Sequence, residues 1–160
     1  MSDALPFLSS FHTVEEGWID FNGHMNMGYY TVLFDRCADE AFKTMGFGPD
    51  YRATRNLTTF SAEFHIRYLR EVKRGDRLRS SFYLLDHDPK RFHSFQELYH
   101  SDGWIAATGE GLTLHVDITG PRVVPMPGDV ATRVAAMAAA HATLPRPDGI
   151  GSRIGIPGRG

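Results

Sequence analysis

A run of apolar residues at helical spacing is the feature that most restricts how this chain folds. Between residues 30 and 45 the apolar side chains recur at steps of three and four, which is the period of one face of an α-helix. These residues are Tyr30, Leu33, Phe34, Cys37, Ala38, Ala41, Phe42 and Met45. Charged residues occupy the opposite face, and Gly46 is placed to end the helix. So wide an apolar face predicts a long helix that lies against a large apolar surface.

Most of the remaining chain has the composition of β-strands. Residues 57–72, 77–86, 91–100 and 104–117 are rich in β-branched and aromatic residues, and turn-forming residues separate them. Short turns between the last three predict an antiparallel meander. A further short strand is predicted at His12–Ile19, interrupted by Gly17. The pattern favours an α+β fold with one antiparallel sheet wrapped around the long helix.

The C-terminal quarter of the chain differs in composition. Prolines at positions 121, 125 and 127 mark a break, and the Ala-rich residues 130–142 predict a short second helix. Residues 144–160 contain three prolines and five glycines, which predict either a flexible tail or a strap laid over a neighbouring surface. We therefore expect a main segment, residues 1–120, and an extension, residues 121–160, that belongs to the same domain.

Length and composition limit the class of protein. A chain of 160 residues that is 42% hydrophobic and 22% charged is expected to form one folded domain. Its 17 basic and 19 acidic residues give a formal net charge of −2, which argues against a nucleic-acid partner. No apolar run approaches eighteen residues and residues 1–10 lack a signal-peptide pattern, so we expect neither a membrane partner nor secretion. Cys37 is the one cysteine, which favours a cytoplasmic protein without disulfides.

Residues 20–28, directly before the long helix, carry the densest chemistry in the sequence. Asp20, Asn22, His24 and Asn26 stand at alternate positions in a glycine-containing loop. A helix N-terminus offers unpaired N–H groups and a partial positive charge, which hold an anion or a developing oxyanion. An Asp placed there acts as a nucleophile or as a general base for water, and His or Asn orients a substrate carbonyl. Turn and capping chemistry alone explains the Asp, Asn and Gly residues, although it has no use for His24.

Other candidate groups allow a structural interpretation beside a functional one. Glu71 is either a solvated charge paired with a neighbouring basic residue or a second carboxylate that polarises Asn22 or His24. Lys90 and Arg91 follow a proline-containing turn and are either solvated hairpin residues or contacts to a phosphate. The eight histidines lack metal-binding spacing, so no metal site is expected. Cys37 falls on the apolar face and is expected in the core.

The order of these features resembles the hotdog-fold acyl-CoA thioesterases over roughly residues 10–118. The features are a strand, the loop Asp-x-Asn-Gly-His-x-Asn-x-x-Tyr-Tyr, the long apolar helix, and a later strand that ends in a charged segment with Gly-Asp-x-Leu. The resemblance is to the 4-hydroxybenzoyl-CoA thioesterase type and to the related acyl-carrier-protein thioesterases. It implies a helix wrapped by an antiparallel sheet and a homodimer or homotetramer. In the dimer, two sheets join edge to edge and the active sites lie at the subunit interface.

The resemblance also implies catalytic roles for individual residues. Asp20 matches the catalytic carboxylate of the 4-hydroxybenzoyl-CoA type, and Asp20, Asn22 and His24 match the Asp, Asn and His of the carrier-protein type. The strand carboxylate of that second type falls at Glu71 when a one-residue gap is allowed. The amide that holds the oxyanion falls at Met27.

The same resemblance implies where the substrate is held. Lys90 and Arg91 lie where the family often places basic contacts to the CoA phosphates. Asn26 and Met27 stand where the 4-hydroxybenzoyl type has aromatic residues, which argues against an aromatic acyl group.

A narrower similarity, carried by residues 90–100, 114–117 and 151–157, is to thioesterases of carnitine breakdown, which hydrolyse betainyl-CoA. A trimethylammonium group is attracted to aromatic faces. Trp18 and Tyr29 flank the loop and are not needed for the apolar helix face, so we expect them, together with Asn26, to contact the substrate.

We therefore expect an acyl-CoA thioesterase for a short-chain acyl group, with no cofactor other than the CoA of its substrate. Direct attack by water and an acyl-Asp20 intermediate are both open. A non-catalytic hotdog protein that binds CoA esters is the alternative, and a hotdog dehydratase is a third possibility. Asp20 together with Asn22 favours hydrolysis.

Overall fold

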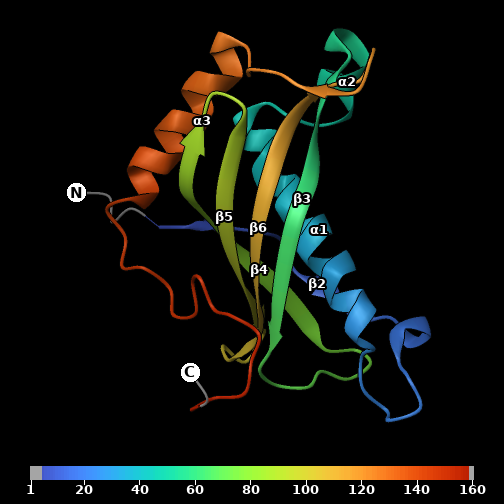
Figure 1. Ribbon diagram of the computed structural model, residues 1–160. Coiled ribbons are helices and arrows are strands. Elements are labelled where there is room, and N and C mark those ends of the chain that lie inside the picture. The colour runs from blue at the N-terminus through green and yellow to red at the C-terminus, as the bar shows by residue number, and fades with distance from the viewer. Residues whose placement is uncertain (1–4, 159–160) are drawn as a thin grey trace.

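The computed structural model describes residues 5–158 and contains one antiparallel sheet that curves around a long helix, as expected for the hotdog fold (Figure 1). Residues 1–4 and 159–160, at the outer ends of the two expected segments, lie outside the described residues. The main strands follow the order β4-β5-β6-β3 and span β3 Leu57–Tyr68, β4 Arg77–Asp88, β5 Arg91–His100 and β6 Ile105–Asp117. The short strands β1 Phe7–Leu8 and β2 His12–Thr13 pair with β4, and β7 Arg122–Val123 pairs with β6. The predicted α+β fold is confirmed.

Helix α1, Met27–Met45, is the predicted long helix, and it lies across one face of the sheet (Figure 1). All the residues of the predicted apolar face are buried except Phe42, which is half-buried. The first half of α1 packs with Val72, Leu78 and Leu98, and the second half with residues of β4, β5 and the C-terminal helix. The helix ends at Gly46, whose φ of 96° is a left-handed conformation that favours glycine. Cys37 is buried, as predicted.

The strands of the meander agree with their predicted positions, but two other predictions need correction. Of the expected first strand, His12–Thr13 alone forms a named strand, because Glu16–Trp18 forms a turn of 3₁₀ helix. Strand β3 ends at Tyr68 rather than at residue 72, because the N–H groups of Leu69 and Arg70 both bind the carbonyl of Ala106 and the chain leaves the ladder there. Residues 69–72 therefore turn away from the sheet toward the loop before α1.

Helix α2, Pro49–Arg55, is absent from the sequence prediction. It begins with a proline at its first position and is only seven residues long, too short to show a helical period. Its one buried residue, Tyr51, donates its hydroxyl proton to Nε2 of the fully buried His115 at 2.7 Å, since His115 Nδ1 is committed to the Val124 carbonyl at 2.8 Å. This pair closes the end of the core near the C-terminus of α1.

The C-terminal extension contributes a helix and a strap. Helix α3, Gly128–His141, begins two residues before the predicted start and buries Val130 and Val134 against the second half of α1 and β4. Beyond it, residues 144–158 form no regular element and run along the outer face of the sheet, where the Gly151 N–H donates to Glu110 Oε2 at 2.8 Å. Of the two alternatives left open for this segment, the structure has the strap, laid on the chain's own sheet (Figure 1). None of the helices within residues 5–158 combines the length and apolar character that a membrane crossing requires.

Candidate active site

The loop before α1 is held in place by backbone pairing on both sides. Ile19 and Met25 form an isolated antiparallel bridge, and the Asn26 N–H donates to the Trp18 carbonyl at 2.9 Å. The Met25 N–H donates to the Val72 carbonyl, also at 2.9 Å, so the turn after β3 is tied to this loop. Residues 20–24 thus form a short, anchored loop whose tip is exposed.

Asp20 occupies the inner position of this loop and is partly buried. Its Oδ1 accepts the Asn22 N–H at 2.8 Å, which is the Asx-turn geometry that the simpler, structural interpretation anticipates. Oδ2 takes no part in this bond. Asn22 itself is exposed and contributes its backbone, not its side chain, to this bond. One carboxylate oxygen therefore orders the loop and the other is available for chemistry.

The first turn of α1 follows directly. Asn26 is the N-cap, and its Oδ1 accepts the Gly28 N–H at 3.0 Å. The structure gives the Asn26 side chain this capping role, and its expected contact with substrate stays a prediction. Met27 is the first residue of the helix, so its N–H has no partner within the helix. The expected oxyanion donor is thus an N–H that the cap leaves unused.

His24 and Glu71 meet beside the loop. His24 Nδ1 lies 3.1 Å from Glu71 Oε2, and both side chains reach solvent. Among the described residues, the ion pair of Glu71 is with His24 and not with Arg70 or Lys73, and the Arg70 guanidinium lies 4.1 Å from the centre of the Trp104 ring. The contact arises because β3 ends early and the following turn brings residue 71 to the loop. The structure thus brings Asp20, Asn22, His24, Glu71 and Met27 to one end of α1.

Trp18 and Tyr29 do not form an open aromatic cage. Their rings stack 5.5 Å apart at an interplanar angle of 12°, and the Arg36 guanidinium lies 5.2 Å from the centre of the Trp18 ring. Trp18 is only 6% exposed. Neighbouring side chains cover Trp18 in the described chain, whereas Tyr29 keeps partial exposure; contact of either residue with substrate stays a prediction.

Lys90 and Arg91 lie at the opposite end of the sheet from this loop within one chain. They form the β4–β5 hairpin, which is tied to the segment before α3 because the Met126 N–H binds the Pro89 carbonyl. Arg91 is engaged by Asp88, with Nη2 2.6 Å from Oδ2. One chain therefore does not bring this pair to Asp20.

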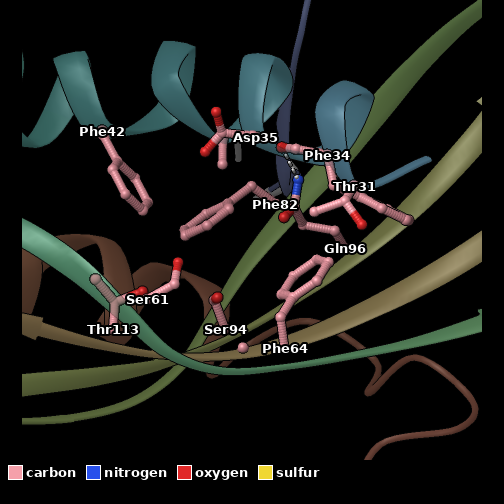
Figure 2. A pocket seen from close by; sticks show the side chains of 12 residues that line it. Thr31, Phe34, Asp35, Phe42, Ser61, Phe64, Phe82, Ser94, Gln96 and Thr113 are labelled. Carbon is pink, nitrogen blue, oxygen red and sulfur yellow. Dashed lines mark hydrogen bonds between the residues drawn. The ribbon is translucent and has the colours of Figure 1, made fainter. Parts of the chain in front are cut away.

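A cavity of about 130 Å³ lies between α1 and the strands β3, β5 and β6 and was not predicted (Figure 2). Its side chains include Thr31 and Asp35 of α1 and Phe64 of β3, and the rings of Phe42 and Phe82 lie between the helix and the sheet (Figure 2). Space for Phe64 exists because β6 has glycines at 109 and 111: a Cβ at Gly109 would lie 2.5 Å from the Phe64 ring. Glycine inside a strand indicates that another group packs closely against it. The Gly-Glu-Gly segment of β6 is therefore the sequence signal from which this site could have been predicted.

Within residues 5–158 no group of three His, Cys, Asp or Glu side chains is arranged to bind a metal ion. The groups gathered at the start of α1 are a carboxylate, a carboxylate–imidazole pair and a free N–H. They suit attack on a carbonyl carbon and stabilisation of the oxyanion that results.

Comparison with known proteins agrees with this chemistry. A family model described as the thioesterase-like superfamily matches residues 14–134. A betainyl-CoA thioesterase from Pseudomonas aeruginosa is 38% identical over 141 residues, which are 88% of this chain and 89% of that protein. An L-carnitine dehydrogenase/betainyl-CoA thioesterase from Rhizobium meliloti is 36% identical over 89% of this chain and 29% of that longer protein.

Among solved structures, a Staphylococcus aureus protein in complex with CoA superposes with a TM-score of 0.87 at 28% identity, over 96% of this chain and 98% of that one. The family match spans most of the chain, and the first curated relative is similar over nearly its whole length. The chain belongs to the thioesterase-like superfamily.

Proposed function

We propose that this protein is an acyl-CoA thioesterase that hydrolyses betainyl-CoA to betaine and free CoA. The observation that carries the proposal is the 38% identity with the Pseudomonas aeruginosa betainyl-CoA thioesterase over nearly the full length of both chains. The relative in which a thioesterase of this name is joined to an L-carnitine dehydrogenase supports a place in carnitine breakdown. The CoA-bound structural neighbour supports a CoA ester as the substrate.

The proposed chemistry uses the loop before α1. The Met27 N–H, at the positive end of the α1 dipole, donates a hydrogen bond to the thioester oxygen as negative charge develops on it. Asp20 either takes a proton from the water molecule that attacks the carbonyl carbon or attacks that carbon itself. His24, oriented by Glu71, lies next to Asp20. Breaking the C–S bond releases the CoA thiol and the free acid, and water is the one co-substrate we propose.

The proposed assembly and location follow from other features. β3 has a strand partner, β6, on one side only within the described chain, and this free edge supports a dimer or tetramer with sites near the subunit boundary. The single cysteine is buried and unpaired, which supports a reducing compartment, the cytoplasm.

Release of CoA from a panel of esters tests the proposal. The purified protein is given betainyl-CoA, acetyl-CoA, isovaleryl-CoA, a long-chain acyl-CoA and a 3-hydroxyacyl-CoA, and free thiol is measured. We expect the highest kcat/KM for betainyl-CoA and little release from the long-chain ester. Tight binding of the esters without thiol release would instead support the non-catalytic alternative, and loss of water from the hydroxyacyl ester would support a dehydratase.

A further inference from the structure

The cavity beside α1 and the proposed oxyanion donor, Met27, lie on the same helix. Its first helical residue, Thr31, is four residues beyond Met27, a rise of about 6 Å. Asp35 is one turn further along, and helical side chains lean toward the N-terminus, so its carboxylate covers the turn nearer to Met27. In betainyl-CoA the cationic nitrogen is only two bonds from the thioester carbon. A group that recognises this cation must therefore lie near the oxyanion site, and Thr31 is the cavity residue nearest to Met27 along α1.

The cavity walls combine aromatic rings with one negative charge. Phe34, Phe42, Phe64 and Phe82 line it, and Asp35 is the one charged side chain among its described lining residues. In the described chain Asp35 forms no ion pair and no side-chain hydrogen bond. A quaternary ammonium group has no N–H to donate, so it is recognised by aromatic faces and by an unshared negative charge. This carboxylate is unshared.

The size of the cavity selects for a compact group. A cavity of roughly 150 Å³ holds benzene, which has six non-hydrogen atoms. At about 130 Å³, this cavity suits a trimethylammonium-methyl group, which has five. Its far side is rigid, because Gln96 uses Nε2 to bind both the Phe34 carbonyl and Ser80 Oγ at 3.2 Å. A long acyl chain does not fit.

We propose that this cavity is the acyl subsite and that Asp35, with the surrounding phenylalanine rings, binds the trimethylammonium group of betainyl-CoA. The inference rests on the proposed function and replaces the pair Trp18 and Tyr29, whose stacked rings leave no space between them. Asp35 is solvent-exposed in the described chain, and a neutral acyl group of the same shape leaves its charge without a counter-ion. Selectivity for charge is therefore the property that identifies this subsite.

The test compares two esters of the same shape. In 3,3-dimethylbutanoyl-CoA a carbon atom replaces the betainyl nitrogen, so the ratio of the two kcat/KM values reports on charge recognition alone. We expect wild-type protein to favour betainyl-CoA at least tenfold and Asp35→Asn to lower that ratio at least tenfold. Asp39→Asn is the matched control: Asp39 lies one turn further along α1, outside the cavity lining, and its removal should leave the ratio within about twofold.

Phe64→Leu is a second variant that removes an aromatic face while keeping an apolar wall, and we expect it to lower the ratio about threefold. If Asp35→Asn protein does not fold, the ratio measured for Phe64→Leu tests whether the cavity binds the cation. An unchanged ratio in Asp35→Asn, or equal loss of both esters, overturns the cation subsite even when wild-type protein prefers betainyl-CoA. A wild-type protein that favours the neutral ester overturns both the subsite and the proposed acyl group. Absence of any CoA release overturns the proposed function itself.

Discussion

At the scale of single residues, Asp20 has two roles that substitution separates. Its Oδ1 accepts the Asn22 N–H, and an asparagine keeps such an oxygen while losing the charge. We expect Asp20→Asn to keep the fold and to lower kcat by at least ~100-fold, the usual scale for a lost catalytic acid or base. CoA release measures the activity, and thermal unfolding checks the fold.

Asp117→Asn is a suitable control for this substitution. Asp117 also accepts a backbone N–H two residues ahead, from Thr119 at 2.9 Å, but it lies at the end of β6. We expect this variant to keep normal turnover. More than half of wild-type activity in folded Asp20→Asn protein would remove Asp20 from the mechanism.

The sequence predicted the residues whose surroundings are local and missed those that depend on distant parts of the chain. Asp20 and His24 stand in one short loop, so their proximity needs no tertiary information. The burial of Trp18 depends on Arg36 and Tyr29 stacking around it, and the exposure of Asp35 to a cavity depends on where the edge strand β3 runs. The sequence pattern assigned Asp35 simply to the polar side of α1.

At the scale of elements, α3 is docked through a histidine, which makes its attachment sensitive to pH. His141 Nδ1 accepts the Leu84 N–H at 2.9 Å, and burial lowers the pKa of His141 below its usual 6.5. As the pH falls through about 6.5, the unfolded chain takes up a proton that the folded chain resists. We therefore expect the free energy of unfolding to decrease from pH 7.5 to pH 5.5. Above pH 7.5, His141 is neutral in both states and adds no pH dependence.

Urea unfolding at the two pH values measures the effect. His141→Asn keeps an acceptor near the Leu84 N–H but does not titrate, so its midpoint should change less with pH than that of the wild type. His87→Asn removes one exposed histidine on β4 and serves as the control, with a wild-type pH dependence. The same pH dependence in wild type and His141→Asn would exclude this linkage.

Long elements with a regular sequence period were predictable. Elements whose bounds depend on contacts with distant parts of the chain were not. α1 spans 19 residues and the meander strands are joined by short turns, so both follow from local pattern. The early end of β3 depends on the Ala106 carbonyl, which pairs with two successive N–H groups of another segment. That single irregularity brings Glu71 to His24, so the site was harder to predict than the fold.

At the scale of the whole molecule, one chain separates two groups that substrate binding is expected to join. The Asp20 loop is tied to the turn after β3 through Met25 and Val72. Arg91 pairs with Leu114 of β6, which also pairs with Phe60 near the start of β3, so Lys90 and Arg91 lie at the opposite end of the sheet. If two copies pair antiparallel through their β3 edges, the start of one β3 lies beside the finish of the other. The hairpin of a second copy is then at the same end as the Asp20 loop, where it is available to the CoA phosphates.

The edge of β3 is suited to such pairing. It is twelve residues long and presents Phe60, Phe64 and Tyr68, which are 50%, 37% and 46% exposed. A long apolar edge left open is a liability that proteins usually cover, and a twofold dimer covers it with the same edge of a second copy. We expect light scattering at micromolar concentration to give twice or four times the 17.9 kDa chain mass.

Proline at position 62 tests whether this edge also supports activity. Ala62 is the extra residue of the bulge between Ser61 and Glu63 and has no register partner on β6, so Ala62→Pro spares the pairing within the chain while it distorts the free edge. We expect a monomeric protein that has lost at least tenfold in kcat/KM, whereas Ala62→Ser stays assembled and active. Full activity in a wild-type or Ala62→Pro monomer would refute shared sites, because Asp20 and the cavity beside α1 would then be sufficient without a second copy.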